Sequence, residues 1–200
     1  MVKKYFLDYD KPKSIGKVRS FYGNISILLR AYVYILSLGA TGLENVSELS
    51  VLNANYIAKK ISDSGLYEIP FYPDEIIKHE FVLSANKIKN EKGISALDIS
   101  KRLLDYGIHP PTIYFPQIVS EALMVEPTET ESKEELDNFI DKIIKIGKEA
   151  YNDPDILSKS PRFTTVGRVD EVKASSPKTI CLTWKKWMEI KKENKFKKSS

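Results

Sequence analysis

The sequence contains one cysteine, Cys181, and two histidines, His79 and His109. A single cysteine cannot form a disulfide within the chain, which fits a protein kept in the reducing cytoplasm. Neither histidine is followed by lysine, and no glycine-rich run of the kind that holds a phosphate is present. We expect Cys181 to be a packed or semi-exposed thiol rather than a nucleophile, because no neighbouring base is implied.

The chain also lacks an apolar run that approaches the length of a membrane span. Its N-terminus has two early lysines but no apolar stretch like that of a signal peptide. Hydrophobic residues make up 42% and charged residues 29% of the 200 residues, which is typical of a soluble protein with one good core. We therefore expect a cytoplasmic protein without a membrane partner.

Positive charge is concentrated at the C-terminus, although the net charge of the whole chain is only +4. Only two glutamates oppose the lysines there, which are Lys185, Lys186, Lys191, Lys192, Lys195, Lys197 and Lys198. Such a tail could contact nucleic acid or an acidic surface, but a solvated, frayed terminus explains it better. The rest of the chain is close to neutral, so we do not expect it to bind nucleic acid.

Apolar residues at three- and four-residue spacing predict two helices near the N-terminus, at about 24–39 and 43–62. Gly39 is expected to end the first helix. Both helices are apolar over wide faces, more than one small neighbour could cover. We interpret this excess as a sign of partners that lie outside the chain.

The middle of the chain mixes strand-like and helical patterns. Strands are expected at 79–84, 112–115 and 123–126, and helices at 95–106 and 132–151. This order predicts an α/β (α+β) fold in which helices cover a small sheet. Two further extended segments are expected at 166–172 and 180–182.

A long stretch of unusual residues carries a resemblance to a known family. Residues 107–131 read GIHPPTIYFPQIVSEALMVEPTETE, and SKEELDNFI follows. This region resembles the C-terminal part of glycine decarboxylase, the pyridoxal-phosphate-dependent P-protein of the glycine cleavage system, in the form of subunit 2 of the two-subunit enzyme. The segments YFLDYDKPKSIGKVRSFYGN, SVLNANYIAKK, HEFVLS and DISKRLLDYG match in the same order, which is more specific than a short motif.

The resemblance implies a domain organisation. A small C-terminal domain of a fold-type-I pyridoxal-phosphate enzyme follows long connecting helices. Residues 1–62 would then be a remnant of the large domain with those helices, 63–165 the small domain, and 166–200 an extension with the basic tail.

The implied activity belongs to glycine catabolism. Glycine is decarboxylated on pyridoxal phosphate, and the aminomethyl group passes to the lipoyl arm of the H-protein. In the family the Schiff-base lysine lies in a His-Lys motif upstream of DYDKPKSIG, and this chain has no such motif. We therefore expect an incomplete oxidoreductase that does not bind the cofactor stably alone and needs a lysine-bearing large domain or companion P-protein subunit. The alternative is a stand-alone, non-catalytic interaction module derived from that domain.

Two groups of residues are candidates for site contacts. Ser20, Gly23 and Asn24 precede the first predicted helix, where free backbone N–H groups suit a phosphate. By the resemblance, a loop at this position reaches the cofactor phosphate of the neighbouring subunit, but an ordinary helix cap is an equal alternative.

The second group contains His109, Thr112, Glu126 and Thr128, which flank the predicted strands. They could face an active-site cleft, with His109 orienting a substrate or only filling a hydrogen-bonding corner. Helix capping explains Glu126 and Thr128 equally well. None has the spacing of paired catalytic carboxylates or metal ligands, so we predict no catalytic residue and no metal site.

Overall fold

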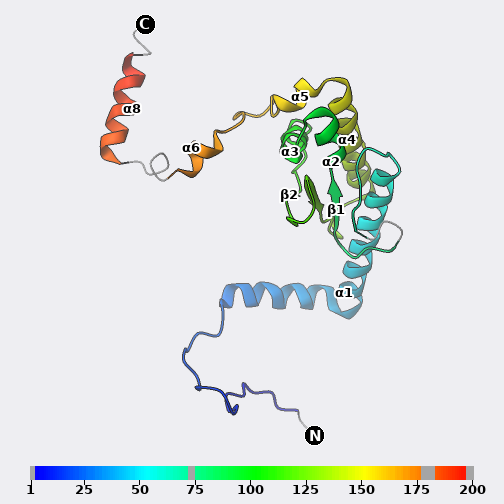
Figure 1. The fold of residues 1–200 in the computed structure, drawn as a ribbon. Helices are drawn as coiled ribbons and strands as arrows, with labels where there is room; N and C mark the ends of the chain where they lie inside the picture. Colours follow the sequence, from blue (N-terminus) through cyan, green and yellow to red (C-terminus); the bar gives the residue numbers. More distant parts are fainter. Residues whose placement is uncertain (1–2, 72–74, 177–182, 197–200) are drawn as a thin grey trace. The chain divides into compact units, whose positions relative to one another are not determined.

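The computed structural model describes residues 3–71, 75–176 and 183–196 (Figure 1). The chain forms two compact units, Met1–Val46 and Ser47–Ser200. Cys181 and the extended segment predicted at 180–182 lie outside the described residues. The division by origin into 1–62, 63–165 and 166–200 stays a prediction.

The first unit consists of an irregular segment and the beginning of helix α1, Ile25–Ser62. The helix starts where the Asn24 side chain accepts the N–H of Ser26 at 3.0 Å. Gly39 interrupts α1 with a non-helical backbone, so the two predicted helices are confirmed but meet at a kink rather than a loop. The apolar side chains before the kink are exposed, among them Leu28, Tyr32, Ile35 and Leu36.

By length and composition, α1 is the one helix among the described residues that could cross a membrane. Its apolar window has a mean hydropathy of 1.5, and none of that window is buried. The prediction that no apolar run approaches the length of a membrane span is therefore wrong. Gly39 was separately expected to end the first helix, whereas α1 continues beyond it with a kink.

The second part of α1 enters the core of the second unit. Ala54, Ile57, Ala58 and Ile61 are buried there at helical spacing. They pack in one cluster with strand residues such as Leu83. This half of α1 therefore forms one side of the core of the second unit.

The sheet of the second unit has three antiparallel strands in the order β1-β3-β2. They are β1 Phe81–Ser84, β2 Thr112–Ile113 and β3 Ala122–Val125. The first two are shorter than predicted, and β3 has the predicted length but begins one residue earlier. In the register Phe81 pairs with Val125, and Thr112 pairs with Met124. The predicted fold, a small sheet covered by helices and preceded by long helices, is confirmed.

Four helices lie in the same unit as this sheet, and α4 contacts the other three (Figure 1). They are α2 Asn86–Lys92, α3 Ala96–Asp105, α4 Lys133–Asn152 and α5 Pro154–Ser158. Ser95 and Asp98 form the expected capping box of α3, and Ser132 caps α4 by accepting the N–H of Glu135. After α3, Gly107 has a φ of 72°, the left-handed conformation that suits glycine, and the chain turns toward β2.

The C-terminal region differs from the sequence prediction. Helix α6, Glu171–Ser175, begins inside the segment 166–172 that was expected to be extended, because Asp170 caps it through the N–H of Lys173. Helix α8, Trp184–Phe196, occupies much of the basic tail that we expected to be frayed. Its Trp184 and Trp187 rings stack with centroids 4.8 Å apart. The two rings can stack because side chains three residues apart are neighbours on one face of a helix.

Candidate functional site

A cavity of about 480 Å³ lies in the second unit, between the end of the sheet and the beginning of α4. All four predicted active-site neighbours line it: His109, Thr112, Glu126 and Thr128. They come from positions up to nineteen residues apart in the chain, and the fold brings them to one place. A contact of these residues with a substrate stays a prediction.

Backbone pairing explains how His109 and Thr112 reach the cavity. The N–H of Ile108 donates to the Leu103 carbonyl at 3.1 Å and closes the end of α3. Two prolines then keep the chain extended until Thr112 pairs with Met124 of β3. His109 and Thr112 therefore lie on a short edge segment beside the central strand.

Glu126 and Thr128 are positioned by the turn between β3 and α4. Glu126 directly follows the last residue of β3. The Asn53 side chain of α1 donates to the Thr128 carbonyl at 2.9 Å, and Asn53 is itself buried. This long-range hydrogen bond fixes the turn against the core.

The cavity is acidic. Glu131 and Glu135 line it together with Glu126, and no lysine or arginine is among its lining residues. Apolar side chains such as Met124 and Phe139 form the remaining wall. Such a lining favours a cationic or neutral polar group over a phosphate or a carboxylate.

Ser20, Gly23 and Asn24 belong to the first unit. Ser20 lines a shallow hollow with Arg19 and Phe21. Gly23 has a φ of 117°, and the Asn24 side chain serves as the cap of α1. The structure thus shows the helix cap, and a contact of these residues with a phosphate stays a prediction.

Sequence reasoning missed several residues that shape the cavity. Glu131 directly precedes Ser132, the cap of α4, and Glu135 lies in the first turn of that helix, so their acidic character at a helix start was recognisable. Asn53 was recognisable as a polar residue four positions before Ile57 on an apolar helix face. The contribution of Asn53 to a turn 75 residues away was not readable from the sequence.

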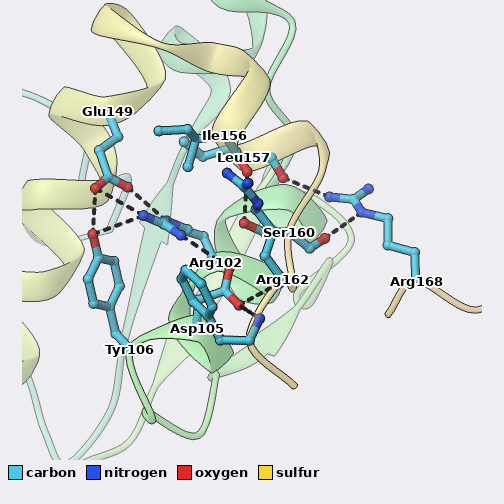
Figure 2. Close-up of polar contacts among 10 residues, drawn as sticks. Arg102, Asp105, Tyr106, Glu149, Ile156, Leu157, Ser160, Arg162 and Arg168 are labelled. Carbon is cyan, nitrogen blue, oxygen red and sulfur yellow. Dashed lines mark hydrogen bonds and ion pairs between the residues drawn. The ribbon is translucent and has the colours of Figure 1, made fainter. Parts of the chain in front are cut away.

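A buried polar network holds α3 and α4 together (Figure 2). The guanidinium of Arg102 donates to Glu149 at 2.9 Å and to Asp105 at 3.2 Å. The Tyr106 hydroxyl also donates to Glu149. The hydrogen bond to Glu149 raises the pKa of Arg102. Burial would raise the pKa of Glu149, but the hydrogen bonds from Arg102 and Tyr106 lower it below its ordinary value.

The same network reaches the segment that follows α5. Asp105 accepts the backbone N–H groups of Arg162 and Phe163 at 2.6 and 2.9 Å. Burial would raise the pKa of Asp105, but these two N–H groups lower it below its ordinary value. Arg168 donates to the Ser160 carbonyl at 2.6 Å, as Figure 2 shows, and to Asp98 at 2.6 Å. These contacts make the network structural rather than catalytic.

The comparisons with known proteins agree with this architecture. The family model described as "Glycine dehydrogenase, C-terminal domain" matches residues 46–158, more than half of the chain. The chain therefore belongs to this family, and the family resemblance read from its sequence is confirmed.

Two relatives illustrate the similarity, and both are named "Probable glycine dehydrogenase (decarboxylating) subunit 2". The relative from Pyrococcus abyssi is 52% identical over 190 residues, which are 95% of this chain and 37% of the relative. The relative from Caldanaerobacter subterraneus subsp. tengcongensis is 55% identical over 172 residues, 86% of this chain and 34% of the relative. The chain thus spans little more than a third of the length of these relatives.

A solved structure shows the same fold. It is described as glycine decarboxylase (P-protein) of the glycine cleavage system in inhibitor-bound form. The match has a TM-score of 0.53 at 20% sequence identity, and it covers 64% of this chain and 28% of that chain. At this identity the likeness supports the fold alone.

Proposed function

We propose that this chain is the C-terminal portion of a glycine dehydrogenase (decarboxylating) of the two-subunit kind. In the complete enzyme, glycine is decarboxylated and its aminomethyl group passes to the lipoyl arm of an H-protein. The observation that carries the proposal is the match of nearly the whole chain to relatives with this name, at about half identity.

Pyridoxal phosphate is the cofactor that this activity needs, and it supplies an electron sink for the carbanion. The described residues do not fit the whole cofactor. None of the described lysines is buried, whereas a Schiff-base lysine has to be desolvated and positioned. The acidic cavity does not suit the cofactor phosphate either. The lysine-bearing part of the site is therefore supplied by another part of the enzyme.

The first unit supports a partner of this kind. Many of its apolar side chains are more than half exposed, among them Leu29, Val33 and Ile35. Gly39 has a non-helical backbone within the apolar helix α1. A backbone break in lipid would leave polar groups unpaired. A protein surface, the large domain or a companion subunit, fits this stretch better than a membrane does.

The two groups of site residues have separate tasks in this proposal. Ser20, Gly23 and Asn24 lie near the cofactor phosphate of the complete enzyme. His109, Thr112, Glu126 and Thr128 form the wall of the active-site cleft on the side of the small domain. The acidic lining of that wall would attract a cationic amino group.

A chimera tests the proposed function. The chain replaces the matching C-terminal segment of the Pyrococcus abyssi relative, and glycine-dependent CO2 release is measured with the lipoylated carrier present. We expect the chimera to retain pyridoxal phosphate and to decarboxylate glycine. Gly23→Val in the chimera should weaken cofactor retention, and unchanged retention would contradict the phosphate contact.

The second candidate is a stand-alone interaction module. The buried core of the second unit favours it, because residues such as Ile57, Leu123 and Ile143 are buried there without any further chain. A chimera that folds and binds the cofactor but releases no CO2 would favour this module over the enzyme part.

A further inference from the structure

Three side chains from two segments that are far apart in the sequence meet at one end of the sheet. They are His79, Glu80 and Glu126, and one ligand atom of each lies within 4.8 Å of the others. His79 Nε2 lies 3.6 Å from Glu126 Oε1. The sequence predicted no metal site, because Glu126 approaches the other two only through the pairing of β1 with β3.

The strand register explains this approach. Phe81 pairs with Val125, so one step further along the antiparallel pair Glu80 comes opposite Glu126. Like charges directly opposite each other destabilise a sheet. Among the described residues, no lysine or arginine forms an ion pair with either carboxylate. The arrangement therefore leaves a local excess of negative charge next to an imidazole.

The backbone that carries these side chains is fixed on both sides. The Asn55 side chain of α1 donates to the Ile77 carbonyl at 2.8 Å and accepts the Ile77 N–H at 3.0 Å, two residues before His79. Asn53 donates to the Thr128 carbonyl at 2.9 Å, two residues after Glu126. Two asparagines of the same helix thus hold the two segments that provide the ligand atoms.

The geometry points to a binding site for a divalent transition metal ion of the Zn²⁺ type, with His79, Glu80 and Glu126 as its ligands. Zn²⁺ accepts imidazole nitrogen and carboxylate oxygen at about 2.0–2.2 Å. Three ligand atoms around such an ion lie roughly 3.3 Å from one another. The ligand atoms of the three exposed side chains therefore have to approach one another by about an ångström or less on average. Three protein ligands leave one coordination position open, beside the cavity that Glu126 also lines.

The two histidines of the chain provide an internal control for the test. Zn²⁺ is titrated into the full chain while the ring resonances of His79 and His109 are followed by NMR. We expect the His79 resonances to shift until one equivalent is bound, while those of His109 remain in place. Equal shifts of both histidines, or no saturable shift of His79, would overturn the proposal.

Substitutions test the carboxylate ligands separately. Glu80→Gln and Glu126→Gln should each weaken Zn²⁺ binding at least about tenfold, as measured by calorimetry, because each removes a ligand. Glu75→Gln is the matched control, since it also removes one negative charge from the segment that precedes β1, but Glu75 is not part of the cluster. An equal loss with Glu75→Gln would mean general surface attraction and would contradict a built site. Circular dichroism of each variant excludes loss of the fold as the cause.

Discussion

At the scale of single residues, Arg102 is the most consequential charged side chain of the described chain. It is only 8% exposed and bonds to Glu149, Asp105 and the Tyr106 hydroxyl. Removing one partner of a buried ion pair leaves the other charge without compensation in a medium of low polarity. The network therefore makes the packing of α3 on α4 depend on one guanidinium.

We predict that Arg102→Met lowers the free energy of unfolding by about 3–5 kcal/mol, because Glu149 and Asp105 lose their buried partner. Urea denaturation measures this change. The control is Lys159→Met, which breaks the exposed pair with Asp155 and should cost less than about 1 kcal/mol. Similar losses in both variants would contradict the role of burial.

The same network predicts how stability depends on pH. The pKa values of Asp98, Asp105 and Glu149 lie below their ordinary values of 3.8, 3.8 and 4.5. For Asp98, burial opposes this shift, and the hydrogen bonds with Ser95 and Arg168 outweigh it. A carboxyl with a lowered pKa stabilises the fold above its unfolded pKa and loses that contribution as pH falls through its folded pKa.

Stability should therefore be level down to the ordinary carboxyl pKa values and fall steadily below them. Urea midpoints measured across this acid range test the prediction. The difference between the native chain and Arg102→Met should shrink as pH falls, because a protonated Glu149 no longer needs the guanidinium. A difference that stays constant into acid would contradict the account.

At the scale of elements, α4 lies very close to the chain that follows α1. A Cβ added to Gly147 would lie 2.9 Å from Leu66 Cδ1 and 3.2 Å from the buried Tyr67 ring. The Tyr67 hydroxyl also donates to the Ile143 carbonyl of α4 at 3.0 Å, so the ring cannot move away freely. Glycine at 147 is needed for this contact.

We predict that Gly147→Val destabilises the chain by about 1–3 kcal/mol through overpacking. Thermal or urea unfolding measures the loss. Gly167→Val is the control, because a Cβ at Gly167 meets no atom within 4 Å and should change stability by less than about 0.5 kcal/mol. Equal effects at the two positions would show that α4 can shift to accept a side chain.

The elements that the sequence predicted share strong local signals. The capping residues Ser95 and Ser132 and the stop at Gly107 fixed the helix ends, and β-branched or aromatic runs marked the strands. Helix α2 was missed because it is short and buries only Ile88. Helix α6 was missed because its start depends on a single cap at Asp170.

The candidate site was less predictable than the elements. His109, Thr112, Glu126 and Thr128 were expected from their places at element ends, and the fold places them in one cavity. The meeting of His79 with Glu126 depends on the strand register, which local patterns do not specify. The hydrogen bond between Asn55 and Ile77 depends on the packing of α1, and local sequence patterns do not predict it either.

At the scale of the whole molecule, the two units differ in completeness. The second unit has a closed core that includes Ile57, Leu123 and Ile143. The first unit exposes large side chains such as Tyr5, Phe6 and Ile15. A chain that spans about a third of its relatives' length and exposes one apolar unit fits a part of a larger enzyme.

The central claim is that the cofactor-binding lysine lies outside this chain. The most direct measurement is a visible absorbance titration of the purified chain with pyridoxal phosphate, followed by addition of glycine. We predict no saturable band and no response to glycine, because no described lysine is buried. A saturable band that changes with glycine would show that a lysine of this chain holds the cofactor, and it would contradict the proposal of an incomplete enzyme part.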